Sequence, residues 1–242
     1  MLPFEGIIIK SMPYLEQAKI VTMLTPSGKE RFIIRGASKI KSKNRVISQV
    51  LMRLSFQASA KGSLKTLTES EILDSYDIIK DNYDKMQSVF PILEKCDHFA
   101  EQVTDTQVFY AFVKSMLELL KDSPHHHSLR NLFELKLTYL LGIGPHFASC
   151  TNCGKEEGLQ LVPHEGGVLC SSCIKPSMST TSLQMTQLVK YLYLIKVEKI
   201  TNEFLATVDP FANEIEELID LYYVEFLGFT SMSKKIVKQM NK

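Results

Sequence analysis

The pattern of hydrophobic and polar positions changes character near residue 77 of this 242-residue chain. Before that point, short runs rich in Ile, Val, Phe and Thr are separated by turn signals, which predicts β-strands. These runs cover residues 4–10, 18–26, 29–37 and 50–59. A turn at Lys61–Ser63 leads into a fifth strand. Five short strands in one short segment predict a small closed or partly open barrel of the OB (oligonucleotide-binding) type.

Beyond residue 77, apolar residues recur at the spacing of a helix face. The helical segments expected there are 105–120, 128–142, 182–200 and 209–228, and residues 231–242 form a basic amphipathic helix or a frayed end. Ser128 is expected to cap the second segment and Gly142 to end it. Asp209 and Gly228 are expected to bound the fourth segment.

Four of the five cysteines form two CxxC pairs, Cys150 with Cys153 and Cys170 with Cys173. Each pair can present two sulfurs to one metal ion, and the spacing between the pairs is typical of zinc ribbons. Four thiolates complete a tetrahedral Zn²⁺ site without an open position for substrate, so we expect one structural zinc. A redox site and an iron–sulfur cluster are the weaker alternatives.

The cysteine segment interrupts the helical pattern, which predicts an insertion within a helical domain. The fold class expected is therefore α+β with several domains. We expect an OB barrel at residues 1–76, a helical domain formed by residues 77–149 and 180–242, and a zinc-binding segment inserted at residues 150–179.

Charge is distributed unevenly along the chain, although the formal net charge is only +1. Residues 1–65 contain twelve Lys and Arg against three Glu, a net charge of +9. The remaining residues contain sixteen Lys and Arg against twenty-four Asp and Glu, a net charge of −8. Such an asymmetry indicates an anionic partner for the basic part.

The densest run of positive charge lies at residues 35–45, which contain no acidic residue. Its Gly, Ser and Asn residues predict a loop, and loops of OB barrels bind oligonucleotides. Flexible cations in a loop can neutralise phosphates without reading bases. Phe32 and Phe56 fit the strand pattern and are expected in the core. The candidate nucleic-acid-binding residues are Arg35, Lys39, Lys41, Lys43 and Arg45, widened by Arg31 and Lys10.

Other patterns indicate no catalytic machinery. His125, His126 and His127 are expected in a solvated loop before a helix, and the acids within residues 203–220 on a solvated helix face. No phosphate-loop, Rossmann or HExxH motif occurs. A groove between the apolar helices could hold a short peptide of a partner. No long apolar run or basic leader occurs, so we expect a cytoplasmic protein without a membrane segment.

Several motifs together resemble the RecO family of bacterial DNA repair and recombination mediators. The N-terminal segment "FEGIIIK", the hairpin "LTPSG" and the basic segment "RGASKIKSKN" are similar to that family's opening. The segments "FELKLTYLLGIGPHFASCTNCG" and "PHEGGVLCSSC" resemble its helix and cysteine pairs. The C-terminal "FTSMSKKIV" is also similar, so the resemblance covers nearly the whole chain.

The resemblance implies a non-enzymatic protein that binds single- and double-stranded DNA and anneals complementary strands. It implies RecR as a partner, in some species RecF, and the acidic C-terminal tail of single-stranded DNA-binding protein. It also implies that the protein helps to load RecA onto coated strands. Residues Arg35 and Lys39 match the family's basic DNA-contact segment, and the four cysteines match its zinc ligands. A nucleoid-associated location in the bacterial cytoplasm follows from the resemblance. The alternatives are a zinc-containing OB-fold nucleic-acid enzyme and an RNA-binding protein.

Overall fold

The computed structural model describes residues 4–59 and 64–240. The contacts divide the chain into two compact units. The first comprises residues 1–121 with 237–242, and the second comprises residues 122–236. The domain boundaries expected at residues 76, 149 and 179 stay a prediction.

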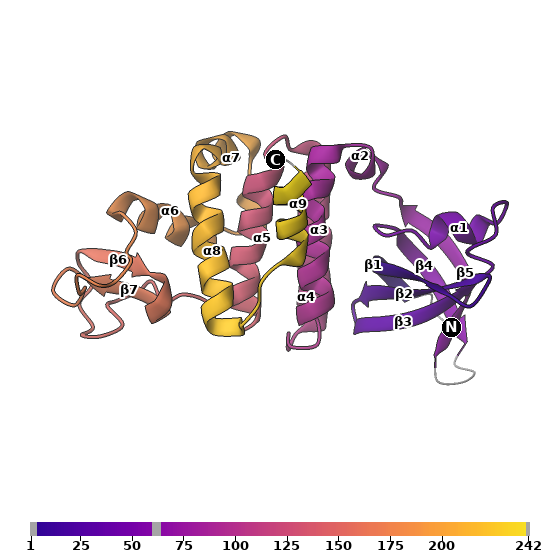
Figure 1. The fold of residues 1–242 in the computed structure, drawn as a ribbon, viewed down its shortest axis with the longest axis horizontal. Coiled ribbons are helices and arrows are strands. Elements are labelled where there is room, and N and C mark those ends of the chain that lie inside the picture. The colour runs from indigo at the N-terminus through magenta and orange to yellow at the C-terminus, as the bar shows by residue number, and fades with distance from the viewer. Residues whose placement is uncertain (1–3, 60–63, 241–242) are drawn as a thin grey trace. The chain divides into compact units, whose positions relative to one another are not determined.

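The first unit begins with a closed five-stranded barrel (Figure 1), and the short strand-like runs of the sequence predict such a barrel. Its strands are β1 Phe4–Tyr14, β2 Ala18–Thr25, β3 Gly28–Arg35, β4 Arg53–Ser59 and β5 Lys65–Asp74. They close in the order β1-β2-β3-β5-β4, and all pairs are antiparallel except the short parallel contact between β3 and β5. The turn expected at Lys61–Ser63 lies outside the described residues.

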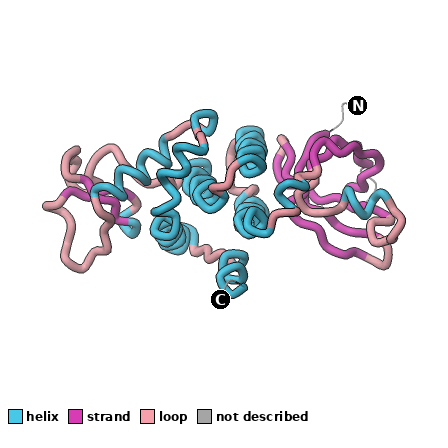
Figure 2. The backbone as a smooth tube through the Cα atoms, turned by 90° about the horizontal axis from the view of Figure 1, so that it is seen from above, coloured by secondary structure: helices cyan, strands magenta, loops and turns pink. Residues whose placement is uncertain are grey.

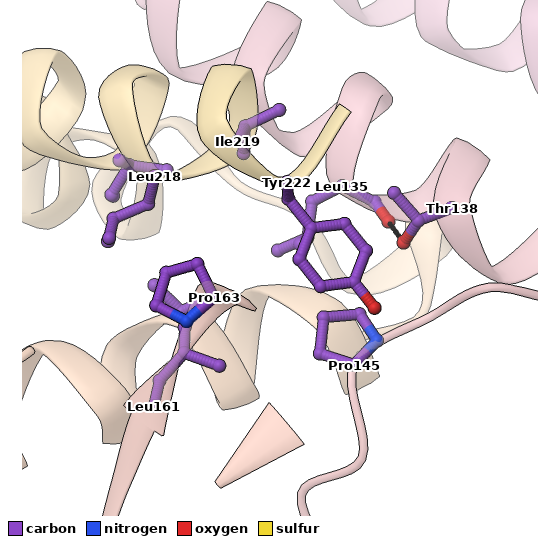
Figure 3. A pocket seen from close by; sticks show the side chains of 10 residues that line it. Leu135, Thr138, Pro145, Leu161, Pro163, Leu218, Ile219 and Tyr222 are labelled. Carbon is purple, nitrogen blue, oxygen red and sulfur yellow. Dashed lines mark hydrogen bonds between the residues drawn. The ribbon is translucent and has the colours of Figure 1, made fainter. Parts of the chain in front are cut away.

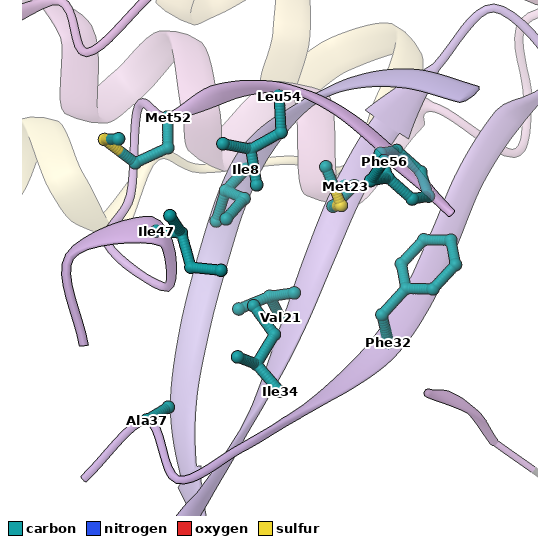
Figure 4. Close-up of a cluster of buried hydrophobic side chains, with 10 residues drawn as sticks. All are labelled: Ile8, Val21, Met23, Phe32, Ile34, Ala37, Ile47, Met52, Leu54 and Phe56. Atoms are coloured by element: carbon teal, nitrogen blue, oxygen red, sulfur yellow. The ribbon is translucent and has the colours of Figure 1, made fainter. Parts of the chain in front are cut away.

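Alternate residues of the strands fill the barrel with apolar side chains. Phe32 and Phe56 are each 2% exposed, and their rings meet edge to face with centroids 4.9 Å apart. Both are therefore core residues, as the strand pattern predicts. Figure 4 shows the cluster they belong to, which also contains Ile8, Val21, Met23, Ile34, Ala37, Ile47, Met52 and Leu54.

A short helix, α1 Lys43–Ile47, follows β3. The expectation of a loop across residues 35–45 is therefore wrong at its C-terminal end. The Ser42 hydroxyl caps the helix by accepting a hydrogen bond from the Asn44 amide at 3.2 Å. The burial of Ile47, which is 8% exposed, holds the helix against the barrel core. The helix propensity of residues 43–47 does not predict this helix, because a helix this short depends on its tertiary contact with the barrel.

Helices α2 Asp77–Lys80, α3 Tyr83–Phe99 and α4 Thr106–Asp122 continue the chain. Polar contacts fasten the first unit's helices to the barrel. The Tyr110 hydroxyl donates a hydrogen bond to Glu5 at 2.7 Å, and the Thr106 hydroxyl donates to the Pro26 carbonyl at 2.9 Å. Burial acts to raise the pKa of Glu5, but Tyr110 and Lys114 hold it below its ordinary value.

The second unit is mainly helical, with a two-stranded hairpin (Figures 1 and 2). Its elements are α5 His126–Leu140, β6 Leu159–Val162, β7 Gly167–Cys170, α6 Leu183–Leu194, α7 Asn202–Val208, α8 Ala212–Leu227 and the start of α9 Met232–Met240. Short 3₁₀ turns occur at Pro163–Glu165, Val197–Lys199 and Asp209–Phe211. Helix α5 packs against α8, which makes this pair the centre of the unit.

The ends of α5 and α8 agree with the sequence at their C-termini but not at their N-termini, whereas α6 begins after Ser182 as expected and ends at Leu194 rather than at residue 200. Gly142 and Gly228 have φ angles of +73° and +59°, and they follow α5 and α8 as expected. Ser128 is not an N-cap, since α5 already begins at His126. Its hydroxyl instead donates a hydrogen bond to Asp209, which lies in a 3₁₀ turn before α8. Ser128 and Asp209 therefore contact each other instead of capping α5 and α8.

A buried network of charges joins α5, α8 and α9 within the second unit. The Lys234 ammonium lies 2.6 Å from a Glu134 carboxylate oxygen and 2.7 Å from Asp220, while Arg130 pairs with Glu216. Glu134 is fully buried and Glu216 is 5% exposed. The expectation that the acids of residues 203–220 form a solvated face is therefore wrong at Glu216.

Candidate nucleic-acid interface and metal centre

The densest positive charge of the barrel lies on residues 35–45, which we call the cationic segment. Gly36 adopts a φ angle of +70°, which turns the chain directly after β3. Two consecutive turns follow, closed by hydrogen bonds from the Lys39 amide to the Gly36 carbonyl and from the Ser42 amide to the Lys39 carbonyl. The Asn44 side chain donates to the Arg35 carbonyl at 2.7 Å. The segment is thus a hydrogen-bonded scaffold rather than an open loop.

The scaffold presents its cations to solvent. All five basic side chains are exposed, and none has an ion-pair partner in residues 4–59 and 64–240. They are Arg35, Lys39, Lys41, Lys43 and Arg45. Cations without a neighbouring carboxylate keep their full attraction for phosphates. This placement is what a phosphate-binding surface requires.

The two residues expected to widen this surface differ in their surroundings. Arg31 is exposed on β3 and forms no ion pair within the described part of the chain. Lys10 lies 2.8 Å from Asp97 of α3, and the same carboxylate is 3.7 Å from Lys29. A phosphate would have to compete with Asp97 for Lys10, so Lys10 is the weaker candidate of the two.

The four cysteines of the CxxC pairs converge at one end of the β6–β7 hairpin. Their sulfur atoms all lie within 4.8 Å of one another. Cys150 and Cys153 form the first turn, which the Gly154 amide closes onto the Cys150 carbonyl at 2.9 Å with a φ angle of +78° at Gly154. Cys170 ends β7, and the Cys173 amide closes the second turn onto its carbonyl at 2.9 Å.

Backbone contacts hold the first cysteine turn against the hairpin. The Thr151 amide donates a hydrogen bond to the Val168 carbonyl of β7 at 2.9 Å. Gly167 has no room for a side chain, because an added Cβ would lie 2.6 Å from the His146 carbonyl oxygen. Backbone contacts therefore hold the first turn against β7.

The surroundings of the sulfurs favour thiolate at part of the cluster. Burial acts to raise the pKa of Cys150, but the amides of Cys170 and Cys153 outweigh it and lower the pKa to about 6. The pKa of Cys170 is also lowered, whereas that of Cys153 is raised to about 11. Metal binding requires deprotonated cysteine, and the amides around Cys150 favour its thiolate form.

The donor set fits a tetrahedral metal ion. Four sulfurs at about 2.3 Å from one zinc ion lie about 3.8 Å from each other. The sulfurs of Cys153 and Cys170 are 3.6 Å apart, and all five cysteines of the chain are free of disulfides. These four cysteines can therefore hold one metal ion together.

The histidines lie outside the cysteine cluster. His164 contacts Glu225 at 2.9 Å, and His146 contacts the Ser149 hydroxyl at 3.2 Å. The expectation of a solvated loop at His125–His127 is wrong, since helix α5 includes His126 and His127. His125 contacts Asp209 and His127 contacts Glu216 at 2.7 Å, so both imidazoles support the packing of α5.

A small apolar pocket lies between α5, α8 and the hairpin of the second unit (Figure 3). Leu135, Pro145, Pro163 and Tyr222 line it, and the Tyr222 hydroxyl donates a hydrogen bond to the Ile143 carbonyl at 2.6 Å. Its free space of about 20 Å³ holds about one water molecule. In this conformation the pocket is too small for the peptide that the helical pattern suggested.

Within residues 4–59 and 64–240, no helix has the length and apolarity that crossing a membrane requires. A five-stranded OB-like barrel followed by helices that carry a four-cysteine cluster defines a mixed α+β protein. Residues 1–76 match the model for "Recombination protein O N terminal", and residues 92–235 match that for "Recombination protein O C terminal". The chain belongs to the recombination protein O (RecO) family.

Curated relatives agree with the family models over nearly the whole chain. DNA repair protein RecO of Listeria monocytogenes serotype 4b is 25% identical over 243 residues, covering 98% of this chain and 94% of the relative. DNA repair protein RecO of Oceanobacillus iheyensis is 27% identical over 241 residues, with coverage of 98% and 93%. DNA repair protein RecO of Bacillus subtilis is 25% identical over 240 residues, with the same coverage.

Proposed function

We propose that this protein is a DNA repair and recombination mediator that binds single- and double-stranded DNA and anneals complementary strands. With RecR, it helps to load RecA onto strands coated by single-stranded DNA-binding protein. The observation that carries the proposal is the cationic segment, whose five exposed cations have no ion pair within the described residues. Relatives across 98% of the chain bear the name DNA repair protein RecO, which supports the choice of DNA as the anion.

The proposed mechanism is electrostatic and involves no catalytic residue. Two complementary strands repel each other through their phosphates, and cations bound between them lower that repulsion. Arg35 and Lys39 stand at the start of the cationic segment, and Lys43 and Arg45 stand on α1. Their separation along the scaffold allows several phosphates to be neutralised together, with release of counterions. Contacts with RecR and with the tail of single-stranded DNA-binding protein, and in some species with RecF, would then place the protein at coated strands in the cytoplasm, near the nucleoid.

The four cysteines would hold one structural Zn²⁺ in this function. Their sulfurs occupy all four positions of a tetrahedral ion, so the ion would supply no open position for water or substrate. The ion would instead fix Cys150 and Cys170 to each other across the hairpin. Its contribution would be to the stability of the second unit rather than to the binding of DNA.

A salt titration with a matched pair of variants tests the electrostatic part. Wild-type affinity for a single strand should fall steeply with salt, and the Arg35→Glu/Lys39→Glu variant should lose about 1.4 from the log–log slope, for two phosphate contacts. Lys175→Glu/Lys199→Glu makes the same charge change at exposed lysines of the second unit and should leave the slope unaltered. A flat salt response of the wild type contradicts the proposal.

Annealing of complementary strands gives the functional readout. The wild type should accelerate annealing, both with naked strands and with strands coated by single-stranded DNA-binding protein, and Arg35→Glu/Lys39→Glu should lose most of the acceleration. The strands should remain intact at the end of the reaction. Cleavage of the strands would favour a nuclease, and stronger competition by RNA than by DNA would favour an RNA-binding protein.

A further inference from the structure

A groove lies beside the cationic segment, where β5 separates from β3 in the barrel. Strand β3 pairs with β5 only at Phe32 with Lys65 and at Ile33 with Thr66. Beyond Thr66, the described pairing of β5 is with β4 alone. Helix α1 occupies the place beside β5 where β3 would otherwise continue, and a groove of about 520 Å³ remains between α1 and β5. This volume lies within the range of small-molecule sites, about 300–1,000 Å³.

The strand register shows that the groove opens onto the interior of the barrel. Ile72 stands opposite Leu54, and Ser70 stands opposite Phe56. Residues opposite each other in a sheet point to the same face, and Leu54 and Phe56 belong to the core. Ile72 is nevertheless 44% exposed, because no strand covers it on this side.

The floor and the walls of the groove are apolar. Ile47 points from α1 toward the core cluster (Figure 4), and Leu67 packs against the same cluster from β5. Val46, which is 49% exposed, and Ile72 form the walls. Exposed aliphatic side chains that converge on a groove mark a binding site more often than an ordinary surface.

Polar groups are interspersed among these apolar residues. The side chains of Asn44, Thr68 and Ser70 line the groove, and the described residues offer no hydrogen-bond partner to the hydroxyls of Thr68 and Ser70. Lys43 lines the groove as well. The occupant must therefore have apolar faces, hydrogen-bonding edges and a negative charge close by. An aliphatic side chain of a peptide would leave both hydroxyls without a partner.

The charges around the groove restrict where its anion lies. The strand register places Glu69 and Glu71 opposite Gln57 and Ser55, on the outer face of the barrel and away from the groove. On the groove side, Lys43 lines the groove, and Arg45 is the other basic residue of α1. A phosphate next to the groove would thus meet attraction and little repulsion.

From these observations we infer that the groove between α1 and β5 binds an unpaired nucleobase of a single strand whose phosphates lie on the cationic segment. This inference rests on the proposed function, since it assigns a base site beside the proposed phosphate contacts. A base has two apolar faces for Val46 and Ile72, and its edge carries hydrogen-bonding groups for Thr68 and Ser70. A base held here is withdrawn from stacking, and the protein thereby distinguishes an unpaired strand from a duplex.

An abasic strand separates the base site from the phosphate contacts. Two strands of equal length, oligothymidylate and its abasic counterpart, carry the same number of phosphates. The full-length wild type should bind oligothymidylate about fivefold more tightly. This is the lower end of what a base stacked on an aromatic side chain contributes, because Val46 and Ile72 are aliphatic. Equal affinity for the two strands would overturn the inference, while a steep salt dependence for both would leave the proposed function standing. A flat salt dependence would reject the proposed function itself.

Two tryptophan variants locate the site. Thr68→Trp fills the groove from an exposed position without a change of charge, and it should abolish the preference for bases while the salt slope stays as in the wild type. Gln57→Trp places the same side chain on the outer face and should keep the preference. If the two variants behave alike, the base lies elsewhere and the inference fails.

Photo-crosslinking provides a readout that needs no variant. A single strand that contains 5-iodouracil, irradiated with the wild type, should form crosslinks within residues 43–47 or 67–72. Crosslinks confined to other segments would contradict the inference. A protein partner is the alternative occupant of the groove. If the wild type shows no preference for bases, and an acidic peptide competes with DNA for the wild type but not for Thr68→Trp, the groove binds a peptide and the base site is overturned.

Discussion

Removal of the Lys234 ammonium tests the buried charge network of the second unit. Lys234 is 3% exposed, and its ammonium lies 2.6 Å from the carboxylate of Glu134, which is fully buried. Burial acts to lower the pKa of Lys234, but the carboxylates of Glu134 and Asp220 raise it above the ordinary value of 10.5. The stability that the charge contributes is therefore complete below pH 10.5 and is lost only as the pH rises through the folded-state pKa.

The Lys234→Met variant keeps most of the side-chain volume and removes the charge. The carboxylate of Glu134 then stays buried without the Lys234 ammonium, and the Nε of Arg130 lies 3.9 Å from it. Breaking a buried pair in this way costs about 3–5 kcal/mol in the free energy of unfolding. Lys235→Met, at the exposed neighbouring position, should cost less than about 0.5 kcal/mol.

Urea unfolding at neutral pH, followed by far-ultraviolet circular dichroism, measures these free energies. The double variant Glu134→Gln/Lys234→Met removes both charges, and it should be more stable than Lys234→Met alone by about 2 kcal/mol. The reasoning is refuted if Lys234→Met costs no more than Lys235→Met. It is also refuted if the two substitutions of the double variant are additive, because the pair would then contribute no coupling.

Three further outcomes follow from the geometry of the second unit. Metal analysis of the purified protein should give about one zinc per chain, and Cys170→Ser should lower the melting temperature without altering the salt dependence of DNA binding; unchanged melting would contradict a structural metal. Gly167→Ala should lower the melting temperature too, because its Cβ would lie 2.6 Å from the His146 carbonyl oxygen, whereas Gly142→Ala meets no atom within 4 Å and perturbs only the φ angle of +73°. Burial acts to raise the pKa of Asp209, but Ser128 and His125 hold it below 3.8, so its contribution to stability should persist above pH 3.8 and disappear as the pH falls further. Asp209→Asn should flatten that acid limb of the stability curve, and an unchanged limb would show that Asp209 makes no such contribution.

Local patterns in the sequence predicted those parts of the fold that local physics determines. Alternation of apolar residues is enough to place Phe32 and Phe56 inside a barrel, since every second side chain of a strand shares a face. Gly142 and Gly228 are readable as helix ends because only a left-handed residue allows that termination. The cysteine spacing likewise placed four sulfurs within 4.8 Å of one another.

Features that depend on partners distant in the sequence were not predictable in this way. Arg130 and Glu134 are spaced as an ordinary exposed pair of a helix, and nothing nearby indicates that both are buried or that Glu134 pairs with Lys234. The groove between α1 and β5 likewise depends on contacts between residues distant in the sequence. It exists because β5 departs from β3 after Thr66, and this departure is a property of strand pairing rather than of residue type. The cationic segment, by contrast, is predictable from the sequence, since residues 35–45 contain five basic residues and no acid.

The fastening of the barrel to α3 and α4 has a consequence for truncation experiments. A fragment that ended at residue 76 would remove Tyr110 from Glu5 and would release Lys10 and Lys29 from Asp97. The released lysines would add free positive charge, and the fragment would bind any polyanion with a steeper salt dependence than the intact chain. Binding by such a fragment would overstate the contribution of the barrel. A fragment that extends through Lys121 retains Asp97. The charges of Lys10 and Lys29 therefore remain balanced in that fragment.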